Sequence, residues 1–291
     1  MQILAVLHNR GVAQDLHPAS LFAVETGDQS MRTIATTALL GLAAAGSCWG
    51  AAGSDYTIRL SATAWFAEPH GDLDYSAGTL SGNIPTTGDL DLENTEVAPS
   101  LEAGVRLPFL FDIYAGYSGY GTEGARRLTE DLKFGDNTYS AGSDIDSELS
   151  IDDLYVELTA GVDILGKAGI GGGLALHYVA GEFDLRNDTH SDSFDENFIV
   201  PTLAVRAFVN PIESLTLEAR GHFIDLAIGD NEVVLVDMDA RIIWYPLEVV
   251  GVIGGYRLTD YDLDLEDVGV ADDAVIDLTL GGPFLGIAAQ F

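Results

Sequence analysis

The sequence predicts an all-β fold: a closed, antiparallel, up-and-down β-barrel of about ten strands, or of eight strands if one hairpin lies outside it. Runs in which every second residue is apolar recur from residue 56 to the end of the chain. Short turns and long acidic loops connect these runs in alternation. No apolar run after Met31 reaches the roughly 18 residues of a membrane-spanning helix, and an even strand count allows the sheet to close.

Residues 1–52 are predicted to be absent from the mature protein. Arg32 precedes a small-residue apolar run from Ile34 to Ala45, and Gly50-Ala51-Ala52 offers a cleavage site, as in a secretory signal peptide. We therefore expect translation to start at Met31 rather than at the first residue, and residues 53–291 to form the barrel domain. Residues 45–48 also form a degenerate lipobox, so lipidation of Cys48 is the alternative to ordinary cleavage.

Each expected strand is an apolar alternation bounded by turn residues or by an acidic segment. In the first strand, for example, Ile58, Leu60 and Ala62 share one face, while Arg59 and Ser61 share the other. The expected strands, in order, are Tyr56 to Ala67, Val97 to Leu107, Leu110 to Tyr120, Glu148 to Asp163, Ala168 to Leu185, Asn197 to Val209, Leu215 to Asp225, Val233 to Trp244, Val249 to Tyr261 and Ala274 to Phe291.

The connections between the strands fall into two kinds. Four are tight turns in which Pro or Gly separates two apolar runs: residues 107–109, 164–167, 210–213 and 245–248. The others are longer and acidic: residues 68–96, 121–147, 186–196, 226–232 and 262–273. Both ends of the barrel domain therefore fall on the short-turn side, and several strands are long enough to continue into paired loop stems.

The last strand ends on an aromatic residue, with Leu285, Ile287, Ala289 and Phe291 on one face. This pattern resembles the final strand of small bacterial outer-membrane β-barrel proteins, the porin-like and OmpA-OmpW-like superfamily, in which a terminal Phe serves as an assembly signal. The resemblance implies a transmembrane β-barrel in the outer membrane of a Gram-negative cell. It implies outer-membrane lipid, lipopolysaccharide and, through Phe291, the barrel-assembly machinery as partners.

Charge narrows the range of partners and chemistries. Residues 1–52 hold three of the 46 acidic and two of the 13 basic residues, so the remainder carries 43 acidic and 11 basic residues and a net charge of −32. Nucleic acid is therefore not expected as a partner. No cysteine follows Cys48, which excludes a disulfide framework, a thiol nucleophile and a cysteine zinc site from the barrel domain.

The charged residues inside the strands are expected to point into the lumen. In the fourth strand Asp153, Tyr155 and Glu157 oppose Leu154 and Val156, and a charge on the lipid face would cost about 2–4 kcal/mol. The same alternation assigns six arginines and seven acids to an inner charged network: Arg59, Glu102, Arg106, Asp112, Asp153, Glu157, Arg206, Glu218, Arg220, Asp237, Asp239, Arg241 and Arg257.

Two functions fit such an interior. About eight strands leave a lumen that side chains just fill, so a salt-bridge network in a barrel of about ten strands is expected to act as a plug. The barrel then has a structural or surface-interaction role, and the alternative is a narrow, low-conductance solute pathway lined by Arg, Asp and Glu. No cofactor is expected. Weak calcium binding is considered at three acidic runs, Asp89 to Glu93, Asp144 to Glu148 and Asp260 to Glu266, although solvated stems of loop hairpins are the better explanation.

An outer-membrane hydrolase is the minority hypothesis, and no residue is assigned as catalytic. Omptin-like proteases use an Asp pair facing an Asp-His pair, and Asp72, Asp74, Asp188 and His190 offer a partial likeness. The residues around these positions differ from the omptin pattern, and the two pairs occur in the wrong order along the chain. His177 and His222 are inward-facing candidates for a lipid A deacylase site, but the sequence offers them no convincing serine partner.

Overall fold

The computed structural model describes residues 57–77, 80–85, 95–107, 111–129, 131–134, 137–228, 231–266 and 273–291. The predictions of a signal sequence starting at Met31, of cleavage near residue 52 and of a lipidated Cys48 fall on residues 1–56, outside these ranges, as does the acidic run 89–93. None of the described residues forms a helix long and apolar enough to cross a membrane.

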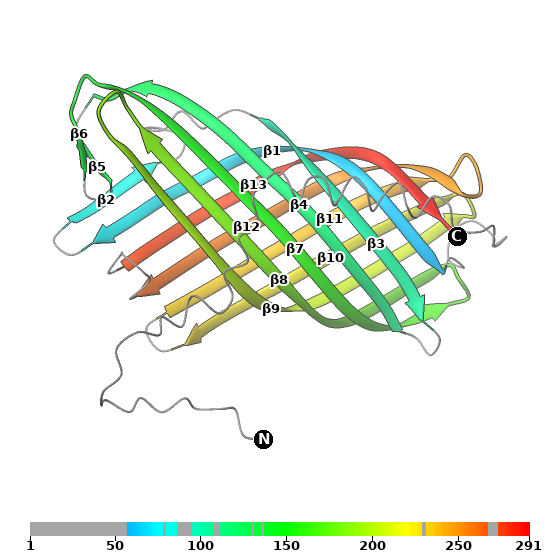
Figure 1. Cartoon of the computed structure of the whole chain (residues 1–291). Coiled ribbons are helices and arrows are strands. Elements are labelled where there is room, and N and C mark those ends of the chain that lie inside the picture. Colours follow the sequence, from blue (N-terminus) through cyan, green and yellow to red (C-terminus); the bar gives the residue numbers. More distant parts are fainter. Residues whose placement is uncertain are drawn as a thin grey trace, which may run out of the picture. The chain divides into compact units, whose positions relative to one another are not determined.

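Ten long strands form one antiparallel sheet that closes on itself (Figure 1). The closure joins the first strand to the last, in register from Arg59 opposite Gln290 to Ser76 opposite Asp273. The predicted ten-stranded barrel is confirmed, and the eight-stranded alternative is wrong. The strands are β1 (Ile58–Ala77), β3 (Glu96–Leu107), β4 (Phe111–Arg127), β7 (Asp144–Ile164), β8 (Ala168–Arg186), β9 (Ser191–Ile212), β10 (Leu215–Ile228), β11 (Asn231–Trp244), β12 (Val250–Glu266) and β13 (Asp273–Gln290).

Several strands extend further at their loop ends than the sequence predicts. β7 begins at Asp144 rather than at residue 148, because the alternation of faces continues: Asp146 and Glu148 are exposed, while Ile145 and Leu149 are buried. β1 likewise runs on to Ala77. Much of what looked like acidic loop is therefore paired strand, because a carboxylate at every second position leaves the other face free for apolar burial.

Three short strands supplement the barrel at its loop end. β2 (Leu80–Pro85) pairs with the end of β1, and β5 (Leu132–Phe134) pairs with β6 (Asn137–Tyr139) inside the connection between β4 and β7. The Tyr139 hydroxyl donates to Leu185 O at 2.8 Å and contacts Asp192 Oδ2 at 2.9 Å. Burial raises the pKa of Tyr139, so the hydroxyl keeps the proton that it donates. This hairpin is thus fastened to β8 and β9.

Two of the short turns show how the sequence sets the strand ends. In the turn after β7, Leu165 (φ 55°) and Gly166 (φ 68°) adopt the two left-handed conformations of a tight hairpin turn, closed by Lys167 N donating to Ile164 O at 3.0 Å. The turn predicted at residues 210–213 lies instead between Ile212 and residue 215. Asn210 N still donates to Lys167 O at 2.7 Å, which keeps residues 210–212 within β9.

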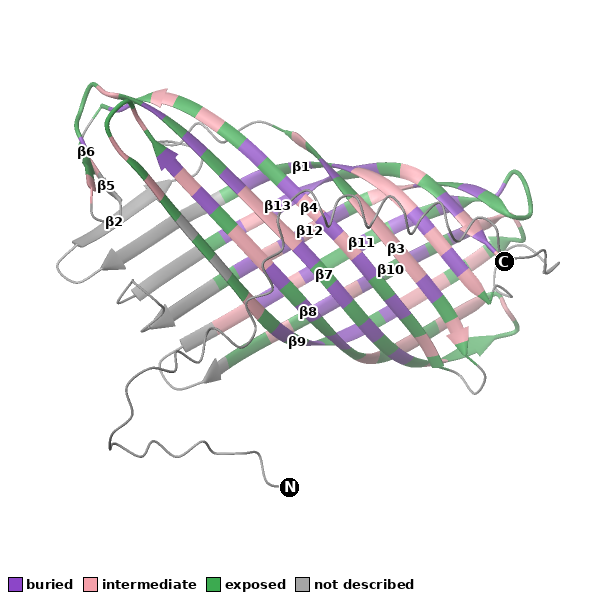
Figure 2. Cartoon of the chain, in the orientation of Figure 1, coloured by how far each residue is buried: buried purple, intermediate pink, exposed green. Residues whose placement is uncertain are grey.

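The two faces of the sheet alternate between buried and exposed residues along each strand (Figure 2). On β7 the outward residues Leu154, Val156 and Leu158 are 47%, 54% and 50% exposed, whereas Tyr155 and Glu157 are buried. The fold therefore places an apolar belt on the outside of the barrel and gathers polar groups on its inside.

Candidate functional site in the barrel interior

A band of charged side chains crosses the middle of the barrel interior. We call it the charged band, and it consists of Arg59, Glu102, Asp153, Glu157, Arg206, Glu218, Arg220, Asp237, Asp239, Arg241 and Arg257, together with His177 and His222. These residues come from β1, β3 and β7 to β12. No side chain in the band is more than 8% exposed. The charges are therefore largely shielded from bulk water and need partners at hydrogen-bond distance, which they find in one another.

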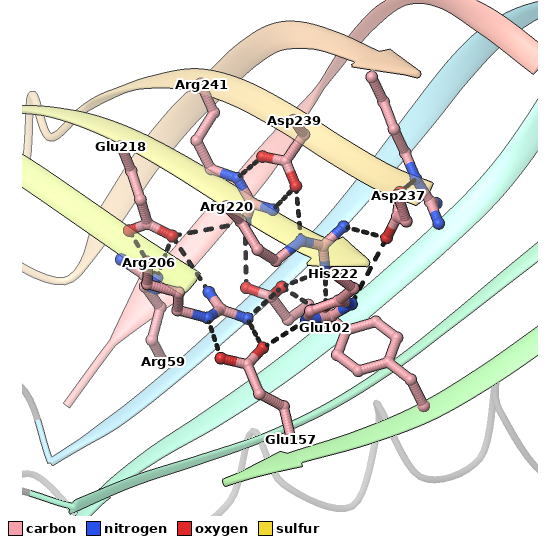
Figure 3. A network of polar contacts seen from close by, with 12 residues as sticks. Arg59, Glu102, Glu157, Arg206, Glu218, Arg220, His222, Asp237, Asp239 and Arg241 are labelled. Atoms are coloured by element: carbon pink, nitrogen blue, oxygen red, sulfur yellow. Dashed lines mark hydrogen bonds and ion pairs between the residues drawn. The ribbon is translucent and has the colours of Figure 1, made fainter. Parts of the chain in front are cut away.

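Two glutamates act as the hubs of the band (Figure 3). Glu102 on β3 accepts from Arg206 at 3.3 Å, from Arg220 at 3.2 Å and from Arg241 at 3.0 Å. Glu218 on β10 accepts from Arg59 at 2.9 Å and from Arg206 at 3.2 Å. Each hub joins arginines from different strands, so the network links strands across the lumen as well as neighbouring strands.

The arginines also make forked, two-point contacts, which fix both distance and orientation. Arg206 contacts the two Glu157 oxygens through Nε and Nη2, both at 2.7 Å. Arg241 contacts the two Asp239 oxygens through the same pair of atoms, both at 2.6 Å. Such contacts are the strong form of a charge-assisted hydrogen bond, so the guanidinium planes are held rigidly.

Arg220 and Arg257 complete the network around two aspartates of β11. Arg220 lies 3.0 Å from Asp237 and 2.7 Å from Asp239, and Arg257 Nε donates to Asp237 at 2.7 Å. Each aspartate is therefore shared: Asp237 between these two arginines, and Asp239 between Arg220 and Arg241. The band is one connected system and not a set of separate pairs.

Tyrosine rings lying over glycines support two of the arginines. The guanidinium of Arg206 lies 3.4 Å from the ring centroid of Tyr114, and a Cβ added at Gly104 would come within 2.5 Å of that ring. Arg220 lies 5.0 Å from the ring centroid of Tyr155, and a Cβ at Gly116 would come within 2.2 Å of Tyr155. The glycines thus make room for the rings, and the ring faces attract the guanidinium groups.

The remaining predicted pair, Arg106 and Asp112, lies apart from the band near the short turns. Its atoms are 3.2 Å apart and the side chains are 28% and 27% exposed. Both residues line a cavity of about 180 Å³ that also touches Arg59, Arg206 and Thr216. The structure therefore brings eleven of the thirteen predicted network residues into one band and leaves these two at its edge.

A layer of apolar side chains fills the interior on the loop side of the band, and sequence reasoning missed it. We call it the apolar layer, and it consists of Tyr120, Leu149, Val179, Phe183, Val200, Leu235, Tyr261, Leu278 and Leu280, each no more than 5% exposed. Leu235 lies two positions from Asp237 toward the loops, and Val179 two positions from His177. A signal was present for part of the layer, because Leu149, Phe183, Tyr261 and Leu278 each adjoin a carboxylate on the opposite face.

The candidate histidines of the hydrolase hypothesis lie in two separate places. His177 and His222 are fully buried in the charged band, where they contact each other and the carboxylates of Asp153 and Glu157. His190 lies in the connection between β8 and β9, with Nδ1 2.9 Å from Thr189 Oγ1. These arrangements show histidines held by carboxylates or by a neighbouring threonine.

The acidic groups of the omptin comparison lie near the loops. Asp72 and Asp74 belong to the loop end of β1, where their backbones pair with β13 and β2, and their side chains fall outside what the structure describes. Asp188 is exposed in the connection between β8 and β9. Calcium at the acidic runs stays a prediction; in those runs Asp260 accepts from Thr279 at 2.6 Å, and Asp146 lies 3.7 Å from Arg186.

Comparison with known proteins gives one informative likeness. The outer membrane protease OmpT of Escherichia coli matches with 9% sequence identity and a TM-score of 0.51, over 84% of this chain and 99% of that chain. The translocator domain of the autotransporter NalP from Neisseria meningitidis matches with 12% identity and a TM-score of 0.41, over 90% and 96% of the two chains. Ail, the attachment invasion locus protein of Yersinia pestis, matches with 9% identity and a TM-score of 0.34, over 80% and 98%.

The comparisons establish architecture and nothing finer. No protein-family model matches the chain, and no curated protein matches its sequence. At 9% identity, the likeness to OmpT shows the fold alone. The chain has the closed barrel fold of outer-membrane β-barrel proteins.

Proposed function

We propose that this chain is an integral outer-membrane protein whose barrel is closed to solutes and presents the loop-side strands as a structural and interaction surface at the cell exterior. One observation carries the proposal: the charged band and the apolar layer lie in series along the lumen, and both are buried. A solute would have to separate paired charges and then cross an apolar layer. Both steps oppose conduction.

The outer face supports insertion into a membrane. On β7, outward apolar residues run from Leu154 to Ile164, a span of ten residue steps. At roughly 3.3 Å per step and a tilt of about 40°, that span is about 25 Å high, the height of the apolar band in bacterial barrels. Asp152, the next outward residue toward the loops, accepts a hydrogen bond from the Tyr117 hydroxyl at 2.5 Å and ends the belt on this strand.

The C-terminal residue supports assembly by the route that the resemblance implies. Phe291 O accepts from Thr57 N at 2.6 Å and from Ile58 N at 3.0 Å, and Phe291 N donates to Ile58 O at 2.8 Å. The last residue thus completes the seam between β13 and β1. A partner that recognises this residue during assembly, such as the barrel-assembly machinery, would act on the strand that closes the barrel.

The loop end is the surface that a partner would meet. The stems of β7 and β8 expose Asp144, Asp146, Glu148, Glu182 and Arg186, so four of these five exposed residues are acidic. The β5–β6 hairpin is held against β8 and β9 by Tyr139, which gives this end a fixed shape. A cationic or hydrogen-bonding partner fits such a surface, and lipopolysaccharide phosphates would require bridging cations.

Single-channel recording in planar bilayers tests the proposal. The protein, purified from the expressing bacterium and shown on a gel to be a heat-modifiable folded barrel, should be silent. Discrete openings that change with Arg59→Ala or Arg241→Ala would overturn the proposal in favour of a narrow pathway lined by the charged band. The cavity of about 180 Å³ at the short-turn end is the observation that favours this second candidate. Hydrolysis lost in His190→Ala would instead support an enzyme.

A further inference from the structure

The charged band does not balance when only its permanent charges are counted. Five arginines stand against six carboxylates: Arg59, Arg206, Arg220, Arg241 and Arg257 against Glu102, Asp153, Glu157, Glu218, Asp237 and Asp239. One negative charge is therefore left over in a region where no side chain is more than 8% exposed. An uncompensated buried charge is among the costliest features that a fold can contain. One added proton would balance the band, and the two histidines are its remaining basic side chains.

The two histidine rings form a continuous chain between two carboxylates. His177 Nδ1 lies 3.0 Å from Asp153 Oδ1, and His177 Nε2 lies 3.0 Å from His222 Nδ1. His222 Nε2 lies 2.9 Å from Glu157 Oε2. Three contacts of hydrogen-bond length thus link two acceptor groups through four ring nitrogens.

Counting protons in this chain gives the same answer as counting charges. Each of the three contacts needs one proton, so the chain holds three. Two neutral imidazoles supply only two protons. If both N–H groups donate to the carboxylates, the ring nitrogens that face each other at 3.0 Å each carry a lone pair and no proton. The third proton turns this contact into a hydrogen bond and adds one positive charge.

We propose that His177 and His222 form a single proton-binding site that holds one shared proton and supplies the sixth positive charge of the band. This inference goes beyond the closed-barrel function. It concerns what keeps the interior intact, and its test does not depend on conductance. The ligand of the site is the proton itself, which His177 Nε2 and His222 Nδ1 share on the lumen side of β9.

The strands around the site explain why these two histidines meet. They stand on β8 and β10, and β9 between them carries the small residues Thr202 and Ala204 at the crossing point. Tyr155 packs against both rings, with centroids 5.4 Å from His177 and 5.0 Å from His222. The rings are therefore held together by packing as well as by hydrogen bonds.

The charged groups around the pair are of both signs. The titratable or charged groups that face it are Asp153, Tyr155 and Glu157 on β7, Arg206 on β9, Arg220 on β10, Asp237 on β11, Arg257 and Tyr261 on β12 and Glu102 on β3. Asp237 lies 3.7 Å from His222 Nδ1, and Arg257 lies 3.7 Å from Asp153. The nearest carboxylates contact the rings directly, and the positive charge of Arg220 also acts directly on His222, against their effect.

The site links the stability of the barrel to pH in one direction. Above about pH 7.5 the histidines of the unfolded chain hold almost no protons, because free histidine titrates near 6.5. The folded barrel retains one, so it binds more protons than the unfolded chain and its stability falls as pH rises. One extra proton in the folded state corresponds to a rise of about tenfold in the unfolding equilibrium constant for each pH unit.

Nitrogen NMR of the folded, ¹⁵N-histidine-labelled barrel in detergent at pH 8 reads the site directly. We expect three of the four ring nitrogens of His177 and His222 to be protonated. Assignment uses single His→Gln variants. Two neutral rings at positions 177 and 222 at this pH would overturn the proposal.

Urea unfolding between pH 7.5 and 9 provides the second, independent readout. His222→Gln keeps an amide donor beside Glu157 but cannot carry charge, so it should destabilise the barrel and remove the tenfold-per-unit pH slope. Adding Asp153→Asn to that variant restores a balance of five arginines and five carboxylates and should recover stability without restoring the slope. His190→Gln is the control and should keep the full slope. Identical slopes in the native chain and His222→Gln, or no recovery in the double variant, would overturn the proposal.

Discussion

The barrel interior and the loop-side stems contain the same kinds of charged residue but differ in how these charges are buried and paired. Inside, five arginines and two histidines contact six carboxylates, and every one of these side chains is at least nine-tenths buried. On the loop-side stems, Asp144, Asp146 and Glu148 are exposed on one strand, and Asp146 lies 3.7 Å from Arg186, which is 59% exposed. The difference teaches that burial, and not sequence composition, decides where charges must be paired.

The reason is the dielectric environment of each region. In water, neighbouring carboxylates repel only weakly and salt screens them, so the stems can carry a large net charge. In the interior, each ion gives up its hydration and needs a partner at hydrogen-bond distance. The scarce arginines are accordingly concentrated inside, and the excess acid lies outside.

Removing one interior arginine should have the largest effect. Arg206→Met leaves Glu157 without its two 2.7 Å contacts and takes one donor from each glutamate hub. Breaking a buried pair from one side costs about 3–5 kcal/mol, so the urea midpoint of the folded barrel should drop strongly. Adding Glu157→Gln removes the stranded charge and should recover a substantial part of the loss. A double variant as unstable as the single one would contradict this account of the band.

A charge on the outer face should have the next largest effect. Val156 points outward at the middle of the belt and is 54% exposed, whereas Thr159 points inward and lines the cavity at the short turns. Val156→Arg should cost about 2–4 kcal/mol and lower the yield of inserted barrel, whereas Thr159→Arg should be tolerated better. Insertion is measured by heat-modifiable mobility on a gel. Equal yields would refute the assignment of the two faces of β7.

Much of the fold and of the inner face was predictable from alternation alone. Ten strands and the inward positions of residues such as Glu157 follow from the two-residue period, because every second side chain shares a face. The loop-side extent of the strands was not predictable in the same way. A stem such as β7 from Asp144 to Glu148 is acidic on its exposed face, and that acidity resembles loop composition.

The contacts within the interior could not be read from one strand at a time. His177 and His222 are separated by 45 positions and meet only because β9 lies between them in a fixed register. The rings of Tyr114 and Tyr155 similarly need Gly104 and Gly116 on neighbouring strands. Strand register across the closed sheet sets these pairings, and the sequence carries no local signal for it.

Filling the space beneath a tyrosine ring should have a moderate effect. Gly116→Ala places a methyl group 2.2 Å from the Tyr155 ring, which must shift away from the arginine that it supports. Overpacking of this kind costs about 1–3 kcal/mol, measured as a lower urea midpoint. Gly181→Ala is the matched control, because a Cβ there meets nothing within 4 Å. If both variants unfold at the same urea concentration, the tyrosine support is not a stabilising element.

The smallest effect on stability is expected for an exposed ion pair on the loop-side stems. Arg186 and Asp146 are 3.7 Å apart and about 60% exposed, so water competes for both charges. Arg186→Gln should change the free energy of unfolding by less than about 0.5 kcal/mol, and 1 M salt should erase even that difference. The matched interior change is Arg257→Gln, which removes one of the ion pairs of Asp237. The loss of stability in this variant should persist at high salt. If the two substitutions respond alike to salt, water reaches the charged band as freely as it reaches the stems, and the interior is not closed.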